Sequence, residues 1–108
     1  MFISNEGTFS CPVEALSNIL GKKWVPMLIW TLKDDAKRFG ELQKLIEGCS
    51  KKMINQQLDL LIKHEIVGND KNLSNNTIES FYYLTDKGNT LVPIIETMIM
   101  WGEENLKC

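Results

Sequence analysis

The order of a few short segments in the middle of the chain constrains its fold more than any other feature of the sequence. Apolar residues that recur three or four positions apart predict two short helices, at residues 39–46 and 51–64. The four residues between them include Gly48 and end at Ser50, a residue type that favours the start of a helix. Two short helices joined by such a tight turn are typical of a helix-turn-helix.

A β-hairpin is predicted directly after the second helix. Residues 66–67 and 78–84 are rich in β-branched and aromatic side chains, which favour strands. The polar residues between them are typical of a turn; they include Asn72, Ser74, Asn75 and Asn76. A hairpin in this position indicates the winged variety of the helix-turn-helix.

The flanking segments are predicted to be helical, apart from the N-terminus. Residues 1–10 have no strong periodicity and are expected to form a mobile arm. A helix is expected to begin at Cys11-Pro12 and to end at Gly21. Residues 23–33 are apolar on most sides, which predicts a buried central helix, and a last helix is expected over residues 89–106. The fold class is therefore mainly α with a small β-hairpin, a winged helix-turn-helix.

Length and composition fit one globular domain, residues 1–108, and exclude several other classes of protein. The chain has 108 residues, of which 44% are hydrophobic, enough to build one core. It lacks the run of about twenty apolar residues that a membrane span needs, and its N-terminus lacks a signal-peptide pattern. It also lacks a Gly-rich phosphate loop, metal-ligand spacing and a nucleophile–base motif, so no enzyme activity, metal or cofactor is expected. We expect a cytoplasmic protein, whose three cysteines stay reduced.

The second helix of a helix-turn-helix enters the major groove of DNA and meets base edges with its N-terminal half. Asn55 and Gln56 are suited to adenine, because each side-chain amide can donate and accept a hydrogen bond at once. Lys51 and Lys52 suit phosphate or guanine, and Ser50 with the helix N-terminus can hold a phosphate. The candidate DNA-contacting residues are Arg38, Ser50, Lys51, Lys52, Asn55, Gln56, Lys63 and Lys71.

The net charge of −2 hides an uneven distribution along the chain. Residues 33–64 hold seven basic and five acidic residues, whereas residues 65–108 hold three basic and seven acidic residues. The positive charge therefore lies on the predicted helix-turn-helix, which fits contact with a polyanion. Two alternatives stay open, because a polar helix face is often only solvated and a winged fold can also bind proteins without specific DNA binding.

Six short motifs resemble, in order, those of the HxlR-type regulators, which are related to the MarR family. They read CPVE, GKKW, KRFGEL, SKKMINQQL, YLTDKG and WGE, and they lie at residues 11–14, 21–24, 37–42, 50–58, 83–88 and 101–103. The match runs from about residue 10 to residue 105. The resemblance implies a bacterial, dimeric winged-helix transcription factor that binds a pseudo-palindromic operator in double-stranded DNA.

The resemblance also implies that the N-terminal and C-terminal helices form a dimer interface. This agrees with the last predicted helix, whose apolar residues occupy more than one face. The candidate interface residues are Val13, Leu16, Leu91, Ile94, Ile95, Met98 and Trp101. An inducer of unknown identity could bind between subunits against Trp24, Trp30 and Trp101, although three tryptophans in a core and an interface are the simpler interpretation.

The wing departs from the family pattern. Family wings commonly carry Arg, whereas residues 69–80 contain Lys71 as their one basic residue, beside Asp70 and Glu79. Wing contacts with DNA would then depend on hydrogen bonds from the asparagines of the predicted turn.

Some members of the family use the cysteine before the proline as a thiol sensor, and Cys11 occupies that position. A helix N-terminus stabilises a thiolate, so a redox or electrophile response through Cys11 is one hypothesis; a small hydrophobe packed in an interface is the alternative. Cys49 lies in the predicted turn, and a disulfide from Cys11 to Cys49 of the partner subunit is a further hypothesis. Cys108 is expected to be incidental.

Overall fold

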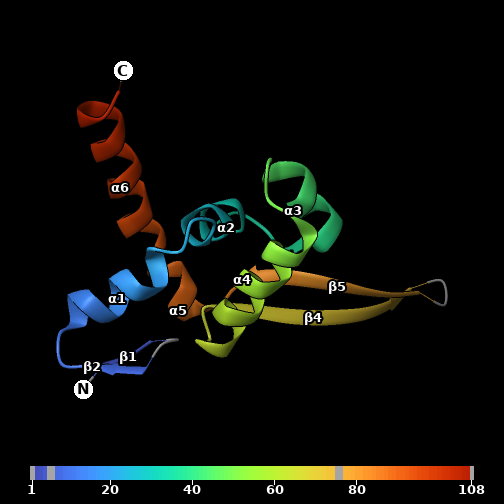
Figure 1. Cartoon of the computed structure of the whole chain (residues 1–108). Helices are drawn as coiled ribbons and strands as arrows, with labels where there is room; N and C mark the ends of the chain where they lie inside the picture. Colours follow the sequence, from blue (N-terminus) through green and yellow to red (C-terminus); the bar gives the residue numbers. More distant parts are fainter. Residues whose placement is uncertain (1, 5–6, 75–76, 108) are drawn as a thin grey trace.

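The computed structural model of the chain describes residues 2–4, 7–74 and 77–107. These residues form a set of helices that share one core, and two small antiparallel sheets (Figure 1). The elements are β1 (Phe2–Ser4), β2 (Gly7–Phe9), α1 (Pro12–Leu20), α2 (Val25–Thr31), β3 (Lys37–Arg38), α3 (Phe39–Leu45), α4 (Lys51–Lys63), β4 (Val67–Ser74), β5 (Thr77–Leu84), α5 (Asp86–Asn89) and α6 (Val92–Asn105). Among the described residues, no helix combines the length and the apolar character that crossing a bilayer requires.

Helix α2 lies at the centre of the fold, between α1 and α6 on one side and α3 and α4 on the other (Figure 1). Its residues Val25, Leu28 and Ile29 are fully buried, and they pack in one cluster with Leu42 of α3 and Leu58 of α4. Apolar residues occupy most positions of this short helix, so it can pack against several neighbours at once, and its proline lies in the first turn, where a helix tolerates it. The prediction of a buried central helix is confirmed.

Helices α3 and α4 form the predicted helix-turn-helix. Gly48 in the turn has a φ of 82°, in the left-handed region that favours glycine, and the ring of Trp24 lies against it. The hydroxyl of Ser50 accepts a hydrogen bond from the backbone N–H of Met53 at 3.1 Å, which caps α4 as the sequence predicts. The turn therefore has the two local signals, a left-handed glycine and an N-cap, that let one helix end and the next begin at once.

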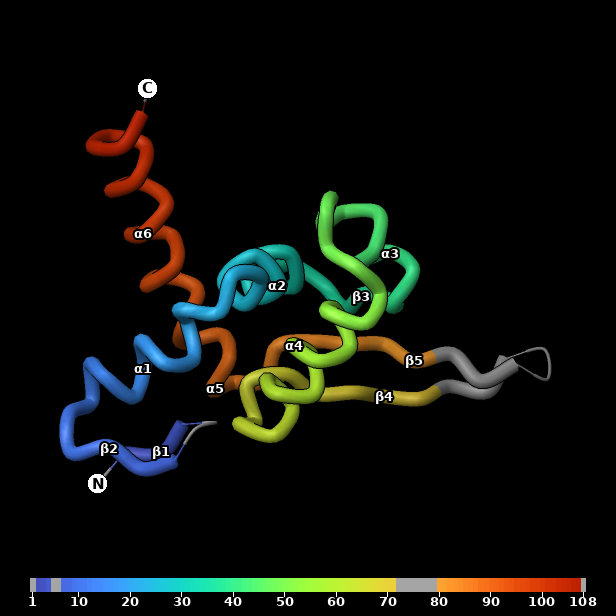
Figure 2. The backbone as a smooth tube through the Cα atoms, viewed as in Figure 1, coloured from blue at the N-terminus to red at the C-terminus, as the bar shows by residue number. Residues whose placement is uncertain are grey.

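The wing is the hairpin β4–β5, which runs from Val67 paired with Leu84 to Ser74 paired with Thr77. Figure 2 shows the two strands running side by side, away from the helices. The predicted hairpin is confirmed, but the predicted turn is wrong at Asn72 and Ser74, which lie within β4. Pairing with a long partner strand outweighs the local turn preference of such residues. Asn75 and Asn76 lie outside the described residues.

The sheet has a third strand that the sequence analysis does not predict. The two-residue strand β3 pairs with the other edge of β5, with Lys37 opposite Tyr82 and Arg38 opposite Phe81. A strand of two residues is too short to show an alternating pattern. This pairing fixes the start of α3 to the base of the wing.

The sequence predicts a mobile arm over residues 1–10, but the described part of this stretch forms a short antiparallel hairpin. Phe2 pairs with Phe9 and Ser4 with Gly7. The buried Ser4 hydroxyl donates a hydrogen bond to the side-chain oxygen of Asn18 in α1 at 2.7 Å. Each strand has three residues, which is too few for a period to show in the sequence. The hairpin lies against the first helix (Figure 1).

The C-terminal helix predicted over residues 89–106 is α6, which begins three residues later, at Val92, and the short helix α5 precedes it. Thr85 caps the short α5 by accepting a hydrogen bond from the N–H of Gly88 at 3.0 Å. Pro93 then lies in the first turn of α6, where a helix begins again, because proline fits the first turn but not an interior. From this start α6 extends away from the rest of the chain (Figure 1).

Candidate nucleic-acid interface

One face of α4 packs in the core and the other lies in solvent. Ile54, Leu58 and Leu61 are at most 1% exposed and fix the rotation of the helix about its axis. The five polar residues predicted on the opposite face are all exposed: Lys52, Asn55, Gln56, Asp59 and Lys63. The helical period therefore places the side-chain amides of Asn55 and Gln56 in solvent, where a molecule bound along α4 could contact them.

The N-terminus of α4 is positively charged. Its first turn contains no acidic residue, and Lys51 and Lys52 are exposed there. Ser50 is exposed as well, although its hydroxyl already accepts the N–H of Met53. The helix dipole adds to the two lysine charges, so this end of α4 suits an anion such as a phosphate.

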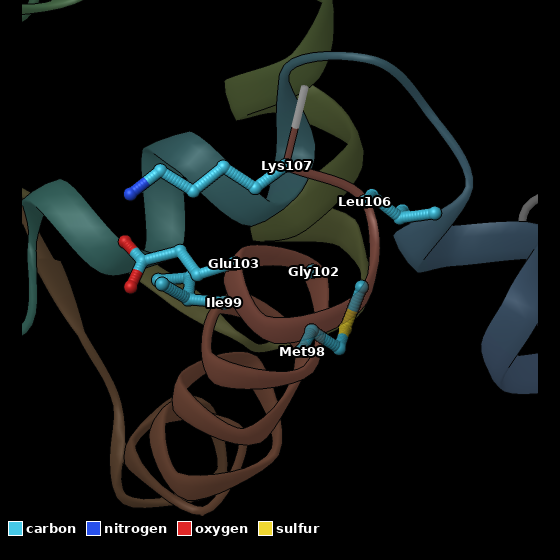
Figure 3. Close-up of a pocket in the computed structure, with 6 residues that line it drawn as sticks. All are labelled: Met98, Ile99, Gly102, Glu103, Leu106 and Lys107. Carbon is cyan, nitrogen blue, oxygen red and sulfur yellow. The ribbon is translucent and has the colours of Figure 1, made fainter.

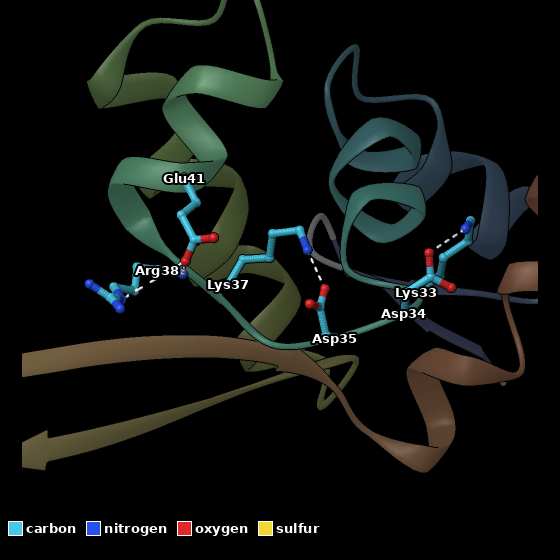
Figure 4. Close-up of polar contacts among 6 residues, drawn as sticks. All are labelled: Lys33, Asp34, Asp35, Lys37, Arg38 and Glu41. Carbon is cyan, nitrogen blue, oxygen red and sulfur yellow. Dashed lines mark hydrogen bonds and ion pairs between the residues drawn. The ribbon is translucent and has the colours of Figure 1, made fainter.

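Arg38 lies at the junction of β3 and α3. Its backbone N–H donates a hydrogen bond to Glu41 Oε1 at 3.1 Å, and its side chain lies 3.9 Å from the same carboxylate oxygen (Figure 4). Its guanidinium also lies 5.5 Å from the centre of the Phe81 ring in β5. The side chain is 56% exposed, so two neighbours orient a cation that solvent still reaches. This support by Phe81 cannot be found from the sequence pattern, because it depends on the pairing of the two-residue strand β3 with β5.

Two lysines that precede Arg38 in the sequence form ion pairs with aspartates close to them in the chain. Lys33 pairs with Asp34 at 2.7 Å, and Lys37 pairs with Asp35 (Figure 4). These local pairs reduce the net positive charge near α3. The exposed basic residues of the helix-turn-helix outside these two pairs are Arg38, Lys44 of α3, and Lys51, Lys52 and Lys63 of α4.

Two buried or half-buried polar groups lie near the base of α4. Burial raises the pKa of the Tyr82 hydroxyl in β5, and the nearby carboxylate of Asp59 raises it further. Burial lowers the pKa of His64 at the end of α4, and the charges of Lys87 and Lys63 lower it as well. His64 is therefore neutral at neutral pH, and its Nε2 atom is buried without a hydrogen-bond partner among the described residues.

On the wing, Lys71 is exposed on β4, opposite Ser80 of β5. The adjacent Asp70 is also exposed, opposite Phe81. The positive charge of Lys71 is thus offset by the negative charge of its neighbour Asp70, so this pair of residues adds no net charge to the wing.

A second surface is apolar and lies on α1 and α6. Val13 is 71% exposed, and together with Leu16, Ile94 and Met98 it lines a hollow of about 330 Å³ between the two helices. A hollow of about 540 Å³ continues along α6, with Met98 on one side and the longer polar chains of Glu103 and Lys107 on the other (Figure 3). Exposed apolar surface of this extent is typical of a protein interface.

The predicted interface residues do not all reach this surface. Ile94, Met98 and Trp101 are 42%, 46% and 58% exposed, whereas Leu16 and Leu91 are half-buried. Ile95 is 1% exposed and packs in the core of its own chain, so assigning it to a surface for a second chain is a correction that the fold imposes. In a helix that is apolar on several sides, only the fold shows which side is covered.

The sequence model of the HxlR-like helix-turn-helix family matches residues 19–108. The chain belongs to this family. It is therefore a transcriptional regulator of the HxlR/MarR type with a winged helix-turn-helix fold, and it is not an enzyme.

Relatives of this HxlR-like chain match it over nearly its whole length. The transcriptional regulator YodB of Bacillus subtilis is 33% identical over 99 residues, which are 91% of this chain and 88% of YodB. A MarR-family structure from Porphyromonas gingivalis W83 is 30% identical, covers 97% of this chain and 99% of its own, and has a TM-score of 0.82. The redox regulator HypR in its reduced form is 32% identical, covers 90% and 95%, and has a TM-score of 0.83.

The cysteines of this HxlR-like chain have different surroundings. Cys11 is exposed at the N-cap position of α1, with extended backbone and no capping hydrogen bond from its side chain. Cys49 is half-buried in the turn between α3 and α4, and burial raises the pKa of its thiol, although the charge of Lys23 opposes this. The start of α1 and the α3–α4 turn lie on opposite sides of α2 and far from each other (Figure 1). Cys108 lies outside the described residues.

The three tryptophans of the HxlR-like chain are not brought together. Trp24 and Trp30 are half-buried against the core, and lysine side chains lie over both rings. Trp101 is exposed on α6, where the hollow that it lines is formed by residues of α6 and its C-terminal end. The described residues also contain no group of three His, Cys, Asp or Glu side chains that could hold a metal ion.

Proposed function

We propose that this regulator binds a specific sequence in double-stranded DNA by placing α4 in the major groove. The observation that carries this proposal is the exposed face of α4, where Asn55 and Gln56 follow the positively charged first turn with Lys51 and Lys52. The amides would recognise adenines, and the lysines with the helix N-terminus would contact guanine or phosphates. Arg38, held against Phe81, would contact a phosphate beside α3, and Lys63 and Lys71 would contact the backbone farther along the groove and at the wing.

We infer that the protein acts as a homodimer through the exposed apolar residues of α1 and α6. A two-fold dimer would present two copies of α4, so the operator would be pseudo-palindromic, with half-sites about one helical turn apart. A regulator of bacterial DNA would act in the cytoplasm.

The test of DNA binding is a titration of labelled duplex by fluorescence anisotropy at several salt concentrations. Phosphate contacts release counterions, so the affinity should fall steeply as salt rises. Lys52→Ala should lower the affinity for all sequences and reduce the salt slope by about one. Lys33→Ala removes the same charge from a residue outside α4 and α6 that already pairs with Asp34, and it is the matched control, with no expected change. Lack of salt-dependent binding to any duplex would favour the alternative, a winged-helix module that binds a protein.

We propose further that Cys11 makes the regulator responsive to oxidants or electrophiles. Support comes from the exposure of its thiol at the N-cap position of α1 and from relatives. HypR is a redox regulator with structures in oxidised and reduced forms, and YodB has diamide-treated and quinone-bound structures. Since Cys49 lies far from the start of α1 in one chain, a disulfide between them would join two subunits.

In this oxidation the thiols of Cys11 and of Cys49 of the partner subunit form one disulfide bond. Their two protons and two electrons pass to the azo group of diamide, which becomes a hydrazine. Non-reducing gels of diamide-treated protein should show a covalent dimer that Cys11→Ser and Cys49→Ser each abolish and that Cys108→Ser retains. A covalent dimer that persists in Cys11→Ser would rule out this bridge.

A further inference from the structure

The C-terminal end of α4 has a strained but well-bonded form. The N–H of Ile66 donates to the carbonyl of Leu61, and the N–H of Glu65 donates to that of Ile62, both at 2.9 Å. This is a Schellman motif, in which the residue after the cap is left-handed and usually glycine. Here that residue is Glu65, with a φ of 60°. A side chain in this conformation needs surrounding contacts that hold it there.

Those contacts come from residues 85–88, which we call the clasp. Three successive carbonyl groups after α4 accept hydrogen bonds from it. Lys87 Nζ donates to His64 at 2.8 Å, the Thr85 hydroxyl donates to Glu65 at 2.6 Å, and the Thr85 N–H donates to Ile66 at 3.1 Å. The strained end of the proposed reading helix is thus held by donors about twenty residues later in the sequence.

The clasp has an internal hydrogen bond and a close packing contact of its own, and it continues into α6. The Thr85 hydroxyl also accepts the N–H of Gly88, and buried Gly88 packs so closely on the Ile66 carbonyl that a methyl group there would overlap the oxygen. The N–H of Leu91 then donates to Gly88, and that of Ile95 to Leu91, each at 3.0 Å. The end of α4 and the start of α6 therefore form one hydrogen-bonded unit around α5.

We infer that the clasp is a positioning element that sets the orientation of α4 relative to α6, and with it the half-site spacing that the dimer accepts. This inference rests on the proposed function, in which α6 joins the subunits and α4 reads DNA. One extra base pair between half-sites moves the second half-site by about 3.4 Å and rotates it by about 35°. A dimer in which α4 has a fixed orientation relative to α6 cannot place both copies of α4 on the displaced half-sites. A dimer in which this orientation varies can do so.

The test compares duplexes that differ only in the spacing of the half-sites. One base pair should cost the wild type roughly tenfold or more in affinity. Thr85→Val keeps the β-branched shape but removes the hydroxyl, and it should reduce this penalty to about threefold or less. Thr85→Ser restores the hydroxyl and should behave as the wild type. Thr31→Val removes a threonine hydroxyl outside the clasp, which donates to the carbonyl of Met27 within α2 at 2.7 Å, and it should leave the penalty unchanged.

A merely structural role for Thr85 predicts a different result. Thr85→Val would then weaken binding to all spacings by the same factor, and the proposal would be wrong. Lys87→Met is the second variant, because Lys87 is exposed and its loss should leave the chain folded while removing one of the three donors. It should relax the spacing preference in the same direction as Thr85→Val.

A distance measurement without DNA separates this proposal from the proposed function. Spin labels would be placed at Asn55→Cys and Glu104→Cys in a chain whose native cysteines are serine, diluted with unlabelled chain. The distribution of distances between α4 and α6 should be narrow in this background and clearly broader with Thr85→Val or Lys87→Met. An unchanged distribution overturns the inference even if DNA binding holds. A broadened distribution in a chain that binds no DNA confirms that the clasp fixes the orientation of α4 relative to α6, and it overturns the proposed function and its half-site consequence.

Discussion

Gly88 lies directly against the carbonyl oxygen of Ile66, so closely that any side chain at this position would overlap a backbone atom. Both residues are buried, and the backbone of α5 would have to move away from the end of α4 to make room. We therefore expect Gly88→Ala to lower the free energy of unfolding by about 1–3 kcal/mol, measured by urea denaturation.

The matched control is Gly40→Ala in α3. Gly40 is exposed and nothing lies within 4 Å of the added methyl group, so this change should instead raise the free energy of unfolding by about 0.5–1 kcal/mol. Equal effects of the two substitutions would show that the contact of Gly88 with Ile66 is not a constraint on the fold.

Two substitutions of Ser50 separate helix capping from DNA binding. Ser50→Ala removes the acceptor for the N–H of Met53 and should cost about 1 kcal/mol of stability. Ser50→Asp keeps an acceptor and a favourable charge at the helix N-terminus, so stability should stay within about 0.5 kcal/mol. The new carboxylate would repel a phosphate, and DNA affinity should fall roughly tenfold. Full affinity in Ser50→Asp would mean that no phosphate lies at the start of α4.

The stability of the protein should fall as the pH drops below about 6.5, because of His64. Its pKa is lower in the folded chain than the usual value of about 6.5, mainly through burial and further through Lys87 and Lys63. The unfolded chain therefore binds the proton first, and stability is lost as the pH falls below about 6.5 and on through the folded pKa. His64 is the one histidine of the sequence, so His64→Gln should flatten this part of the profile, measured by urea denaturation. The same slope in His64→Gln would assign it to other groups.

A charge on the apolar face of α6 should prevent dimer formation. Met98 is 46% exposed and lines both the hollow shared with α1 and the one along α6. Met98→Glu should raise the dissociation constant of the dimer roughly a hundredfold or more in sedimentation equilibrium, because an unpaired carboxylate would be buried. Met27→Glu is the control, since Met27 is 49% exposed on α2 and outside this surface. A dimer unaffected by Met98→Glu would place the interface elsewhere.

The helix-turn-helix was predictable because its signals are local. The spacing of Leu58 and Leu61, the N-cap Ser50 and the left-handed Gly48 each act within one or two turns of backbone, and the structure has them where the sequence puts them. The exposed face of α4 follows from the same period, so the sequence alone is enough to place Asn55 and Gln56 in solvent.

Features that depend on pairing between distant segments could not be derived. The strand β3 exists because β5 passes beside it, and Asn72 lies in a strand because a paired partner outweighs its turn preference. The apolar residues of α6 could not be sorted into core and surface by period alone. Ile95 packs in the core cluster, and this is visible only once the chain is folded.

The most direct test of the account is a selection of binding sites from random double-stranded DNA with the wild type and with Gln56→Ala. We predict that the wild type enriches a two-fold symmetric site, and that Gln56→Ala enriches the same site except for lost preference at one symmetry-related base pair in each half-site, worth about 1–3 kcal/mol of discrimination. An identical site from both proteins, or no enriched site from the wild type, would contradict the assignment of α4 as the reading helix.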